Sequence, residues 1–327
     1  MTWKKLALSG TLLSALALAG CGAGLNSVAS RNETRAEQAY PPEGQFVTVE
    51  GTRLHVVVRG QGPDLVLIHG ASGSARDFTF AMVDRLATRY RVFAFDRPGM
   101  GFSDRTSERF DAARNTGAES PAQQAVVMQA AAAQLGATRP IVLGHSYGGA
   151  VAMAWALERP ENFSGLVIVS GATQVWESGL SPQYPVLAST LGGSTLVPIL
   201  AATVSEDWAR DAVDRIFSPQ MAPSGYADFV GVGLALRRDT LRANARQVNT
   251  LRGHLIEMVP HYPSITQPVE ILHGTADRIV GFDIHARPLA EQLPNARLTP
   301  LRGIGHMPQH VAADEVIAAI DRIAAGL

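Results

Sequence analysis

The chain has 327 residues, a formal net charge of −1 and a charged fraction of 17%. This balance provides no general attraction for nucleic acid, and 46% apolar residues are enough for a large folded core, which excludes extended disorder. The single cysteine, Cys21, excludes a disulfide scaffold and a cysteine-rich zinc or iron–sulfur site.

Residues 1–20 have the features of a signal peptide. Lys4 and Lys5 form a basic start, and the apolar or small residues 6–20 are fewer than the roughly 20 that span a bilayer as a helix. The sequence Leu-Ala-Gly-Cys that ends at Cys21 resembles the lipobox of bacterial lipoproteins. The resemblance implies cleavage before Cys21 and lipidation of that residue. An uncleaved membrane anchor and ordinary cleavage at a small-residue site are the alternatives.

A lipoprotein signal implies an exported protein of the cell envelope whose lipid anchor makes the membrane a partner. Gly22 follows the cysteine, and by the same resemblance the lack of aspartate there favours the outer membrane over the inner membrane. Residues 21–44 have no apolar periodicity, so we expect a lipidated Cys21 followed by a flexible tether that leads to the folded part at Gln45.

From Gln45 onward, short β-branched runs alternate with helical patterns. Runs 45–50 and 53–60 alternate apolar and polar residues and predict a hairpin. Further strands are predicted at 64–70, 90–96, 140–146, 165–171, 269–274 and 296–301. Helices are predicted at 77–88, 120–136, 147–160 and 313–326. This order predicts an α/β fold with a mostly parallel eight-stranded sheet flanked by helices.

Residues 174–265 break the alternation because they contain helical stretches but no clear strand. We therefore expect a helical cap at 174–265, inserted into a core made of 45–173 and 266–327. Within the cap, Arg238, Arg242 and Arg246 are spaced four apart on one helix face. The spacing predicts a solvated face, and contact with anionic lipid headgroups is the alternative.

The sequence Gly-His-Ser-Tyr-Gly at 144–148 is a G-x-S-x-G motif placed between a predicted strand and a predicted helix. A nucleophile on such a sharp turn has a strained backbone, and its neighbours two residues away must lack bulk, which explains Gly144 and Gly148. Ser146 is therefore the predicted nucleophile.

The motifs of residues 45–325 resemble those of the α/β-hydrolases that carry a helical cap. Leu67–Ser72 is similar to the His-Gly loop of that family, and Asp96–Asp104 is similar to its D-x-P-G-x-G-x-S loop. The resemblance implies a catalytic triad in the chain order serine, acid, histidine. Relatives that attack epoxides or carbon–halogen bonds carry aspartate at the nucleophile position, so the resemblance excludes those activities here.

A serine nucleophile needs a base, and His306 is the strongest of the nine histidines because it lies in a glycine-containing loop after the last predicted strand. Asp277, just past a strand, is the predicted acid, with Asp283 as the weaker alternative. His306 and His310 have a metal-like spacing, but no third ligand is apparent, so neither a metal nor a cofactor is expected.

Two backbone amides are expected to stabilise the oxyanion: Tyr147, which follows the nucleophile, and Ala71, with Ser72 as the next choice. The predicted activity is that of a carboxylesterase-like serine hydrolase that forms an acyl-enzyme from a small, mainly apolar acyl substrate. Lactonase, perhydrolase and carbon–carbon bond hydrolase activities are alternatives on the same fold. A non-catalytic binding protein of the envelope is the alternative from a different class.

Overall fold

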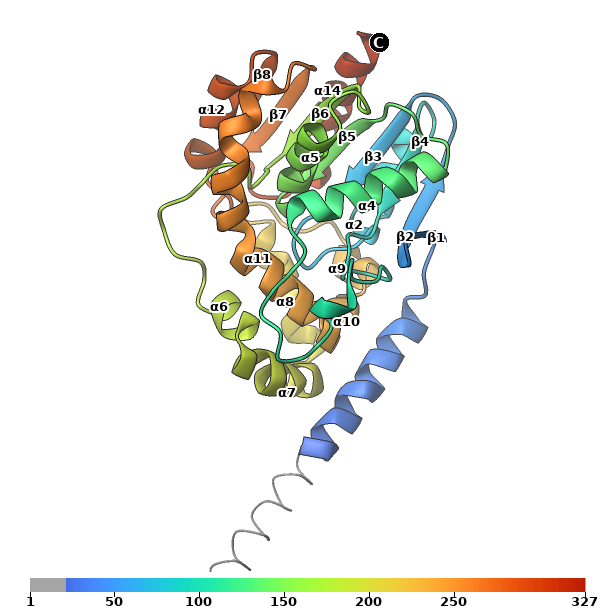
Figure 1. Cartoon of the computed structure of the whole chain (residues 1–327), viewed down its shortest axis with the longest axis vertical. Coiled ribbons are helices and arrows are strands. Elements are labelled where there is room, and N and C mark those ends of the chain that lie inside the picture. Colours follow the sequence, from blue (N-terminus) through green and yellow to red (C-terminus); the bar gives the residue numbers. More distant parts are fainter. Residues whose placement is uncertain (1–21, 327) are drawn as a thin grey trace, which may run out of the picture.

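A computed structural model describes residues 22–326 and contains one eight-stranded sheet with the order β1-β2-β4-β3-β5-β6-β7-β8 (Figure 1). The strands are β1 (Gln45–Val49), β2 (Thr52–Arg59), β3 (Asp64–Ile68), β4 (Arg91–Phe95), β5 (Ile141–His145), β6 (Gly165–Val169), β7 (Val269–Gly274) and β8 (Ala296–Leu301). The ends of each strand differ from those of the run from which it was predicted by at most two residues.

Strands β1 and β2 form an antiparallel hairpin, and β2 also pairs antiparallel with β4. All other neighbours are parallel. Every residue of β5, β6 and β7 is buried, which explains their continuous apolar sequences, since parallel strands are covered on both faces. The predicted fold class, an α/β fold with a mostly parallel eight-stranded sheet, is confirmed.

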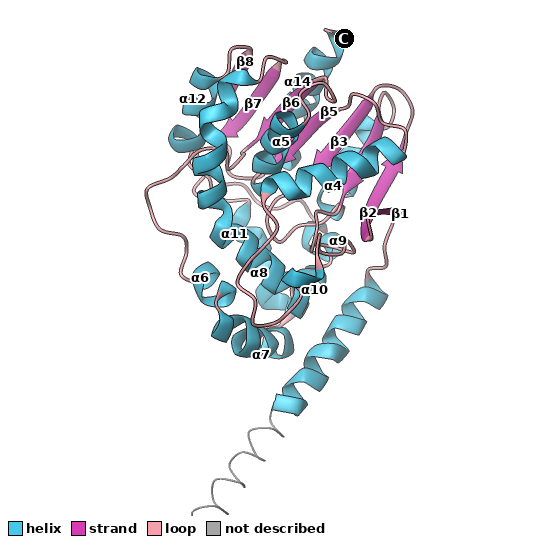
Figure 2. Ribbon diagram, in the orientation of Figure 1, coloured by secondary structure: helices cyan, strands magenta, loops and turns pink. Residues whose placement is uncertain are grey.

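Helices cover both faces of the sheet (Figure 2). On one face, α4 (Pro121–Gln134), α5 (Tyr147–Glu158) and α12 (Phe282–Gln292) share an apolar cluster with the strands. On the other face, α2 (Arg76–Thr79), α3 (Met82–Leu86) and α14 (Ala313–Ala325) form a second cluster. The single helix predicted at 77–88 is thus two short helices, because the backbone leaves the helical region at Ala81, where φ is −153°.

Residues between β6 and β7 form helices that lie below the carboxyl ends of the parallel strands (Figure 1). These cap elements are α6 (Gln183–Ala188), η2 (Gly192–Leu196), α7 (Val197–Thr203), α8 (Glu206–Ile216), α9 (Tyr226–Val230), α10 (Val232–Ala235), α11 (Arg238–Met258) and η3 (Val259–Ser264). Two short elements lie in core loops: η1 (Glu108–Phe110) and α13 (Pro308–Val311). The long helix α11 runs from the cap back to the sheet.

The segment expected to be a flexible tether contains a helix at 22–39 that packs on the cap. Ala29 and Ala36, one heptad apart, are buried, and the Asn32 side chain donates to the carbonyl of Ala201 at 3.0 Å. Small and polar residues make this contact, so the apolar pattern that predicts an amphipathic helix is missing. The expectation of a flexible tether over 21–44 is therefore corrected for residues 22–39, which form this helix.

Residues 1–21 lie outside the described part of the chain, and with them the predicted signal peptide and the lipidation site Cys21. Within residues 22–326, no helix has both the length and the apolar character needed to cross a membrane.

The arginine face of α11 also differs from both expectations. Arg246 is fully buried and donates to the carbonyls of Phe110 and Ala113, each at 2.9 Å. Arg242 is buried as well and donates to Gly193 at 2.8 Å. Both guanidinium groups thus bond to backbone carbonyls, that of Arg246 in η1 and the loop after it and that of Arg242 in η2. Neither solvent nor a lipid headgroup contacts Arg246.

Candidate active site

Ser146 lies on a sharp turn between β5 and α5. Its backbone has φ 54° and ψ −120°, a conformation that costs a non-glycine residue about 1–3 kcal/mol and is concentrated at functional sites. A Cβ at Gly144 would lie 2.2 Å from the carbonyl oxygen of Gly148, and a Cβ at Gly148 would lie 2.2 Å from that of Ile68. The fold therefore requires glycine on both sides of the serine, as the motif predicted.

Three side chains from separate loops form a hydrogen-bonded chain at this turn. The Nε2 atom of His306 lies 3.0 Å from the hydroxyl oxygen of Ser146. The Nδ1 atom of the same ring lies 2.7 Å from Oδ2 of Asp277. Both distances are within the range expected for a nucleophile, its base and the group that orients the base. The structure thus brings together the three residues that the sequence singled out.

Asp277 is held as a carboxylate by several donors. The backbone amides of Ile279 and Val280 donate to Oδ1 at 2.8 and 2.9 Å. Burial acts to raise the pKa of Asp277, but hydrogen bonds from His273 and His306 outweigh it, so the pKa lies below its usual range. An ionised Asp277 accepts from Nδ1–H of His306, which leaves Nε2 of the ring as the acceptor that faces Ser146.

Asp283, the alternative acid, is not part of this arrangement. It lies in the first turn of α12, is largely exposed and pairs with Arg287 on the same helix.

The His-Gly loop after β3 lies directly against the serine. A Cβ at Gly70 would be 3.0 Å from Cβ of Ser146, so the loop approaches the nucleophile as closely as glycine allows. The amide of Ser72 donates to Oδ1 of Asn244, a residue of α11, at 2.7 Å. Among residues 22–326, no group accepts from the amides of Ala71 and Tyr147. The second-choice donor, Ser72, is therefore occupied by the cap, whereas Ala71 and Tyr147 retain their amides for a ligand.

Arg97 is a buried charge that fixes the same loop. Its guanidinium donates to the carbonyls of His69 and Gly70, both at 2.9 Å, and lies 4.4 Å from the ring centre of Tyr147. It also donates to Gln247 of α11 at 2.8 Å. Burial lowers the pKa of Arg97 to about 10, which still leaves it charged at neutral pH. In the sequence, Arg97 stands out only as part of the family-like loop Asp96–Asp104, which carries no sign of these contacts.

Behind His306 lies a second cluster of buried titratable groups around Asp77. Asp77 accepts from the Tyr226 hydroxyl at 2.6 Å and from Nε2 of His310 at 2.7 Å. His145 contacts the backbone carbonyl of His306 through Nε2 at 2.9 Å. Since Tyr226 belongs to α9, this cluster ties the cap to the loop that carries the base.

Three buried histidines make the folded state sensitive to acid. Burial lowers the pKa of His145 and His285 to about 4 and that of His69 to about 3. In the unfolded chain these rings bind protons below about pH 6.5, so the unfolded state takes up more protons than the folded state and stability falls as the pH decreases.

We expect the free energy of unfolding to drop by about 2 kcal/mol per histidine between pH 7.5 and pH 5. Urea unfolding at the two pH values measures this difference. His285→Gln keeps an acceptor for the amide of Gln174 and should reduce the pH dependence by one histidine's share. An unchanged pH dependence in that variant would contradict the assignment.

The reacting groups lie deep under the cap. Ser146 and His306 are 7% and 5% exposed. In the described part of the chain, no cluster of three or more histidine, cysteine or acidic side chains is arranged to hold a metal ion.

Comparison with known proteins agrees with this geometry. The alpha/beta hydrolase family model matches residues 65–319. A pimeloyl-[acyl-carrier protein] methyl ester esterase of Stenotrophomonas maltophilia is 31% identical over 84% of this chain and 97% of its own length. An esterase structure from Exiguobacterium antarcticum has a TM-score of 0.68 at 21% identity and covers 86% of this chain and 99% of the esterase.

A bacterial membrane phospholipase A structure aligns over 98% of this chain and 99% of its own, with a TM-score of 0.63 and 21% identity. At this identity the two solved structures are evidence for the fold alone. The family match, the sheet order and the strand-to-helix turn with its serine all agree, and the chain belongs to the alpha/beta hydrolase family.

Proposed function

We propose that the protein is a serine hydrolase that cleaves a carboxylic ester or a related acyl compound through an acyl-enzyme. The observation that carries this proposal is the chain of contacts from Ser146 through His306 to Asp277, at 3.0 and 2.7 Å. A serine hydroxyl is a weak nucleophile until a base within hydrogen-bond distance removes its proton. A role in folding alone does not require an aspartate, a histidine and a serine to be hydrogen-bonded in this order with the serine on a strained turn.

In the proposed reaction, Nε2 of His306 takes the proton of Ser146 while Oγ attacks the carbonyl carbon of the substrate. Asp277 stabilises the imidazolium and keeps the ring oriented. The imidazolium then protonates the leaving alcohol, and the acyl-enzyme forms. In the second half, His306 removes a proton from water, the hydroxide attacks the acyl carbon, and Ser146 regains its proton as the acid leaves.

The amides of Ala71 and Tyr147 are the proposed oxyanion donors. Tyr147 directly follows the nucleophile and Ala71 follows Gly70, which lies against it, and neither amide donates to another group in residues 22–326. Such amides stabilise the charge that develops on the carbonyl oxygen, and the loss of one donor typically costs about 10²–10³ in rate.

Asn244 holds the loop that carries Ala71, so it acts as a positioning residue. Asn244→Ala should lower kcat about 10–100-fold with little change in KM, because small displacements of an oxyanion donor affect the transition state most. Asn244→Asp keeps an acceptor for the Ser72 amide and should restore most of kcat. Thr250→Ala on the same helix is the matched control, since that hydroxyl bonds only to carbonyls of its own helix. A KM effect with unchanged kcat would contradict this role.

The substrate class that best fits is an ester with a mainly apolar acyl group. The relatives from Nitrosomonas europaea and Stenotrophomonas maltophilia are both named as methyl ester esterases, and one similar structure is an enol-lactonase. We expect hydrolysis of p-nitrophenyl esters with short to medium acyl chains. A panel that includes lactones and thioesters measures the preference, and a clear preference for lactones would favour that alternative.

A binding protein that has lost turnover is distinguished by a direct test. A fluorophosphonate probe should label Ser146 covalently, and heat-unfolded protein should remain unlabelled, because the probe requires an activated serine. A folded chain that is neither labelled nor active on any ester would overturn the proposed function.

We further propose that the protein is exported and held at an envelope membrane through lipid attached to Cys21, with the outer membrane favoured. The support is the lipobox-like sequence after an apolar run in a chain without another cysteine. Cells fed radiolabelled fatty acid should label the protein, whereas Cys21→Ser should remain unlabelled. The anchor would be contradicted if Cys21→Ser were labelled as strongly as the wild type, or if neither protein were labelled.

A further inference from the structure

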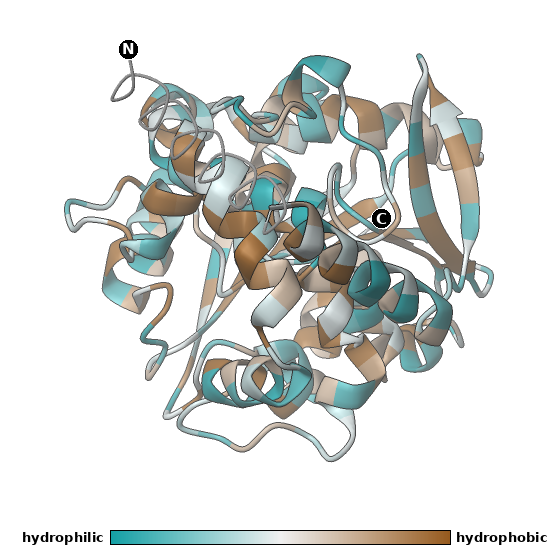
Figure 3. Cartoon of the chain, turned by 90° about the horizontal axis from the view of Figure 1, so that it is seen from below, coloured by the Kyte–Doolittle hydropathy of each residue, from teal (hydrophilic) through white to brown (hydrophobic). Residues whose placement is uncertain are grey.

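One end of the cap has an unusually uncharged surface. Between Glu177 and Glu206 the sequence contains no aspartate, glutamate, lysine or arginine. This run forms α6, η2 and α7, with η2 packed against the other two, at the end of the cap farthest from the sheet (Figure 1). Seen from below, the helices carry both hydrophobic and hydrophilic stretches (Figure 3).

Large apolar side chains project from this run. Leu191 is 72% exposed, and three others are between 39% and 46% exposed: Val186, Leu196 and Ile199. Single exposed apolar residues are ordinary on a protein surface, but several of them in a segment without any charge mark a contact surface. Leu196 and Ile199 are three residues apart across the junction of η2 and α7, so they lie on the same side of the helix.

The helix at 22–39 brings a second uncharged segment to the same end. Its residues 22–30 carry no charge, and its first charged residue is Arg31. Asn32 donates to the carbonyls of Ala201 and Ala202 at the end of α7, at 3.0 and 3.4 Å. From there the helix extends past α7, away from the sheet (Figure 1). Residues 22–30 together with Val186, Leu191, Leu196 and Ile199 are called the apolar pole below.

Ion pairs fix this helix to the cap. Glu33 binds Arg238 through two contacts, at 2.8 and 2.7 Å, and Arg238 also donates to Asn26 at 2.9 Å. Glu37 pairs with Arg237 at 2.9 Å. These arginines are the first residue of α11 and the residue before it, so the helix is attached to the same element that contacts the oxyanion loop.

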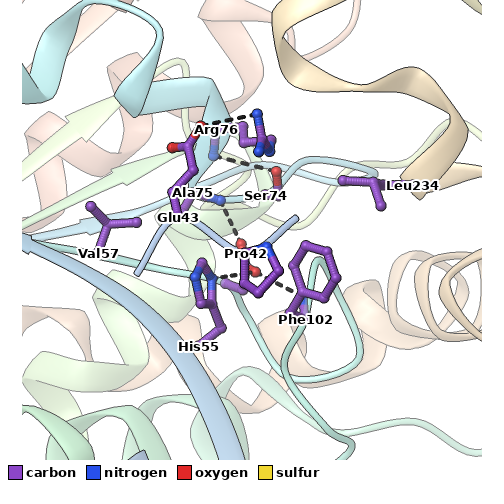
Figure 4. A pocket seen from close by; sticks show the side chains of 10 residues that line it. Pro42, Glu43, His55, Val57, Ser74, Ala75, Arg76, Phe102 and Leu234 are labelled. Atoms are coloured by element: carbon purple, nitrogen blue, oxygen red, sulfur yellow. Dashed lines mark hydrogen bonds and ion pairs between the residues drawn. The ribbon is translucent and has the colours of Figure 1, made fainter. Parts of the chain in front are cut away.

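The linker after the helix is attached to the core. Glu43 pairs with Arg76 at 3.0 Å, and the amide of Gly44 donates to Nε2 of His55 at 2.9 Å. Figure 4 shows this junction, with Pro42 between His55 and Phe102. The linker is therefore held by the helix at one end and by the core at the other. This gives the start of the helix a defined position relative to the cap.

We infer that the apolar pole lies on the surface of a phospholipid bilayer, with the helix at 22–39 as a rigid strut between the anchor and the cap. The chain itself indicates that a bilayer is what contacts the apolar pole. The apolar residues 6–20 and Cys21 come immediately before the first described residue, which is at the pole. Apolar side chains that project from segments without charged residues suit the boundary between headgroups and acyl chains. The inference rests on the proposed membrane anchor and implies a substrate met at the bilayer.

Fluorescence quenching tests the contact directly in the full chain. Leu191→Trp and Val126→Trp each place a new tryptophan at an exposed apolar position, the second on α4 beside the sheet. In vesicles of phosphatidylethanolamine and phosphatidylglycerol with brominated acyl chains, the added fluorescence at 191 should be strongly quenched and that at 126 should not. Equal fluorescence at both positions, or a chain that stays in the supernatant, would overturn the inference.

A second experiment separates the surface from the chemistry. Leu191→Glu with Ile199→Glu should leave hydrolysis of a water-soluble p-nitrophenyl ester unchanged, and should lower hydrolysis of a vesicle-embedded p-nitrophenyl ester of medium chain length about tenfold. Val126→Glu should change neither rate. If the soluble ester is not hydrolysed by any variant while the fluorescence added by Leu191→Trp is quenched, the proposed function fails and the surface assignment stands.

The attachment of the helix at 22–39 to the cap is tested by charge reversal. Glu33→Arg should weaken the quenching at position 191, and Glu33→Arg combined with Arg238→Glu should restore it. A second copy of the chain is the competing occupant. Two results together would assign the apolar pole to self-association and overturn the bilayer contact. Sedimentation would show a dimer that Leu191→Glu dissociates, and the fluorescence at position 191 would not be quenched.

Discussion

Replacing Ser146 by alanine is expected to lower kcat for p-nitrophenyl ester hydrolysis by about 10⁵–10⁶, because among residues 22–326 no other hydroxyl or thiol bonds to His306 and could form the acyl-enzyme. The loss should appear in kcat, since the amides of Ala71 and Tyr147 and the rest of the site still hold the substrate. Steady-state kinetics with the wild type and the variant measure the effect, and active-site probe labelling should disappear in parallel.

The matched control is Ser170→Ala. Ser170 is a buried serine at the end of the neighbouring strand β6, and its hydroxyl has no hydrogen-bond partner within residues 22–326. Removal of an unsatisfied buried hydroxyl is close to neutral for folding. Ser170→Ala should therefore keep nearly full activity. Full activity in the Ser146 variant would sink the proposed mechanism.

The strands and the three reacting side chains could be predicted because their signals are local. Continuous apolar runs identify buried parallel strands, and Gly144 and Gly148 are required by contacts within a few ångströms of the turn that holds Ser146. Asp277 and His306 each follow a strand at the carboxyl edge of the sheet, where the side chains of successive loops meet.

What the sequence could not predict depends on contacts between distant segments. Asn244 reaches Ser72 across 172 positions, and nothing in the pattern of α11 distinguishes it from a surface asparagine. Arg246 has the spacing of a solvated face, yet it is buried because η1 and the loop after it present carbonyls to it. Similarly, the helix at 22–39 is docked through alanines and ion pairs, which leave no apolar periodicity to read.

These distant contacts share one consequence: the cap is connected to each part of the site. Asn244 and Gln247 of α11 reach the oxyanion loop and Arg97, and Tyr226 of α9 reaches Asp77 beside the loop of His306. The N-terminal helix is joined to the start of α11. A displacement of the cap would therefore act on the elements that position the oxyanion donors and the base.

The second large effect is expected for Asp277→Asn, which should lower kcat about 10⁴-fold at neutral pH. The Asn oxygen still accepts from the amides of Ile279 and Val280, so the loop is retained, but its NH₂ group then faces Nδ1 of His306. Nδ1 must become an acceptor, the proton moves to Nε2, and that nitrogen no longer takes the proton of Ser146.

Asp283→Asn is the matched control for this variant, because Asp283 is exposed and contacts only Arg287 on its own helix. Its kcat should stay within about twofold of the wild type, since exposed ion pairs contribute little. Thermal unfolding of both variants separates a loss of folding from a loss of chemistry. If Asp277→Asn were folded and fully active while Asp283→Asn were inactive, Asp283 would be the acid. The loops would then have to differ from the arrangement in which Asp277 and His306 are 2.7 Å apart.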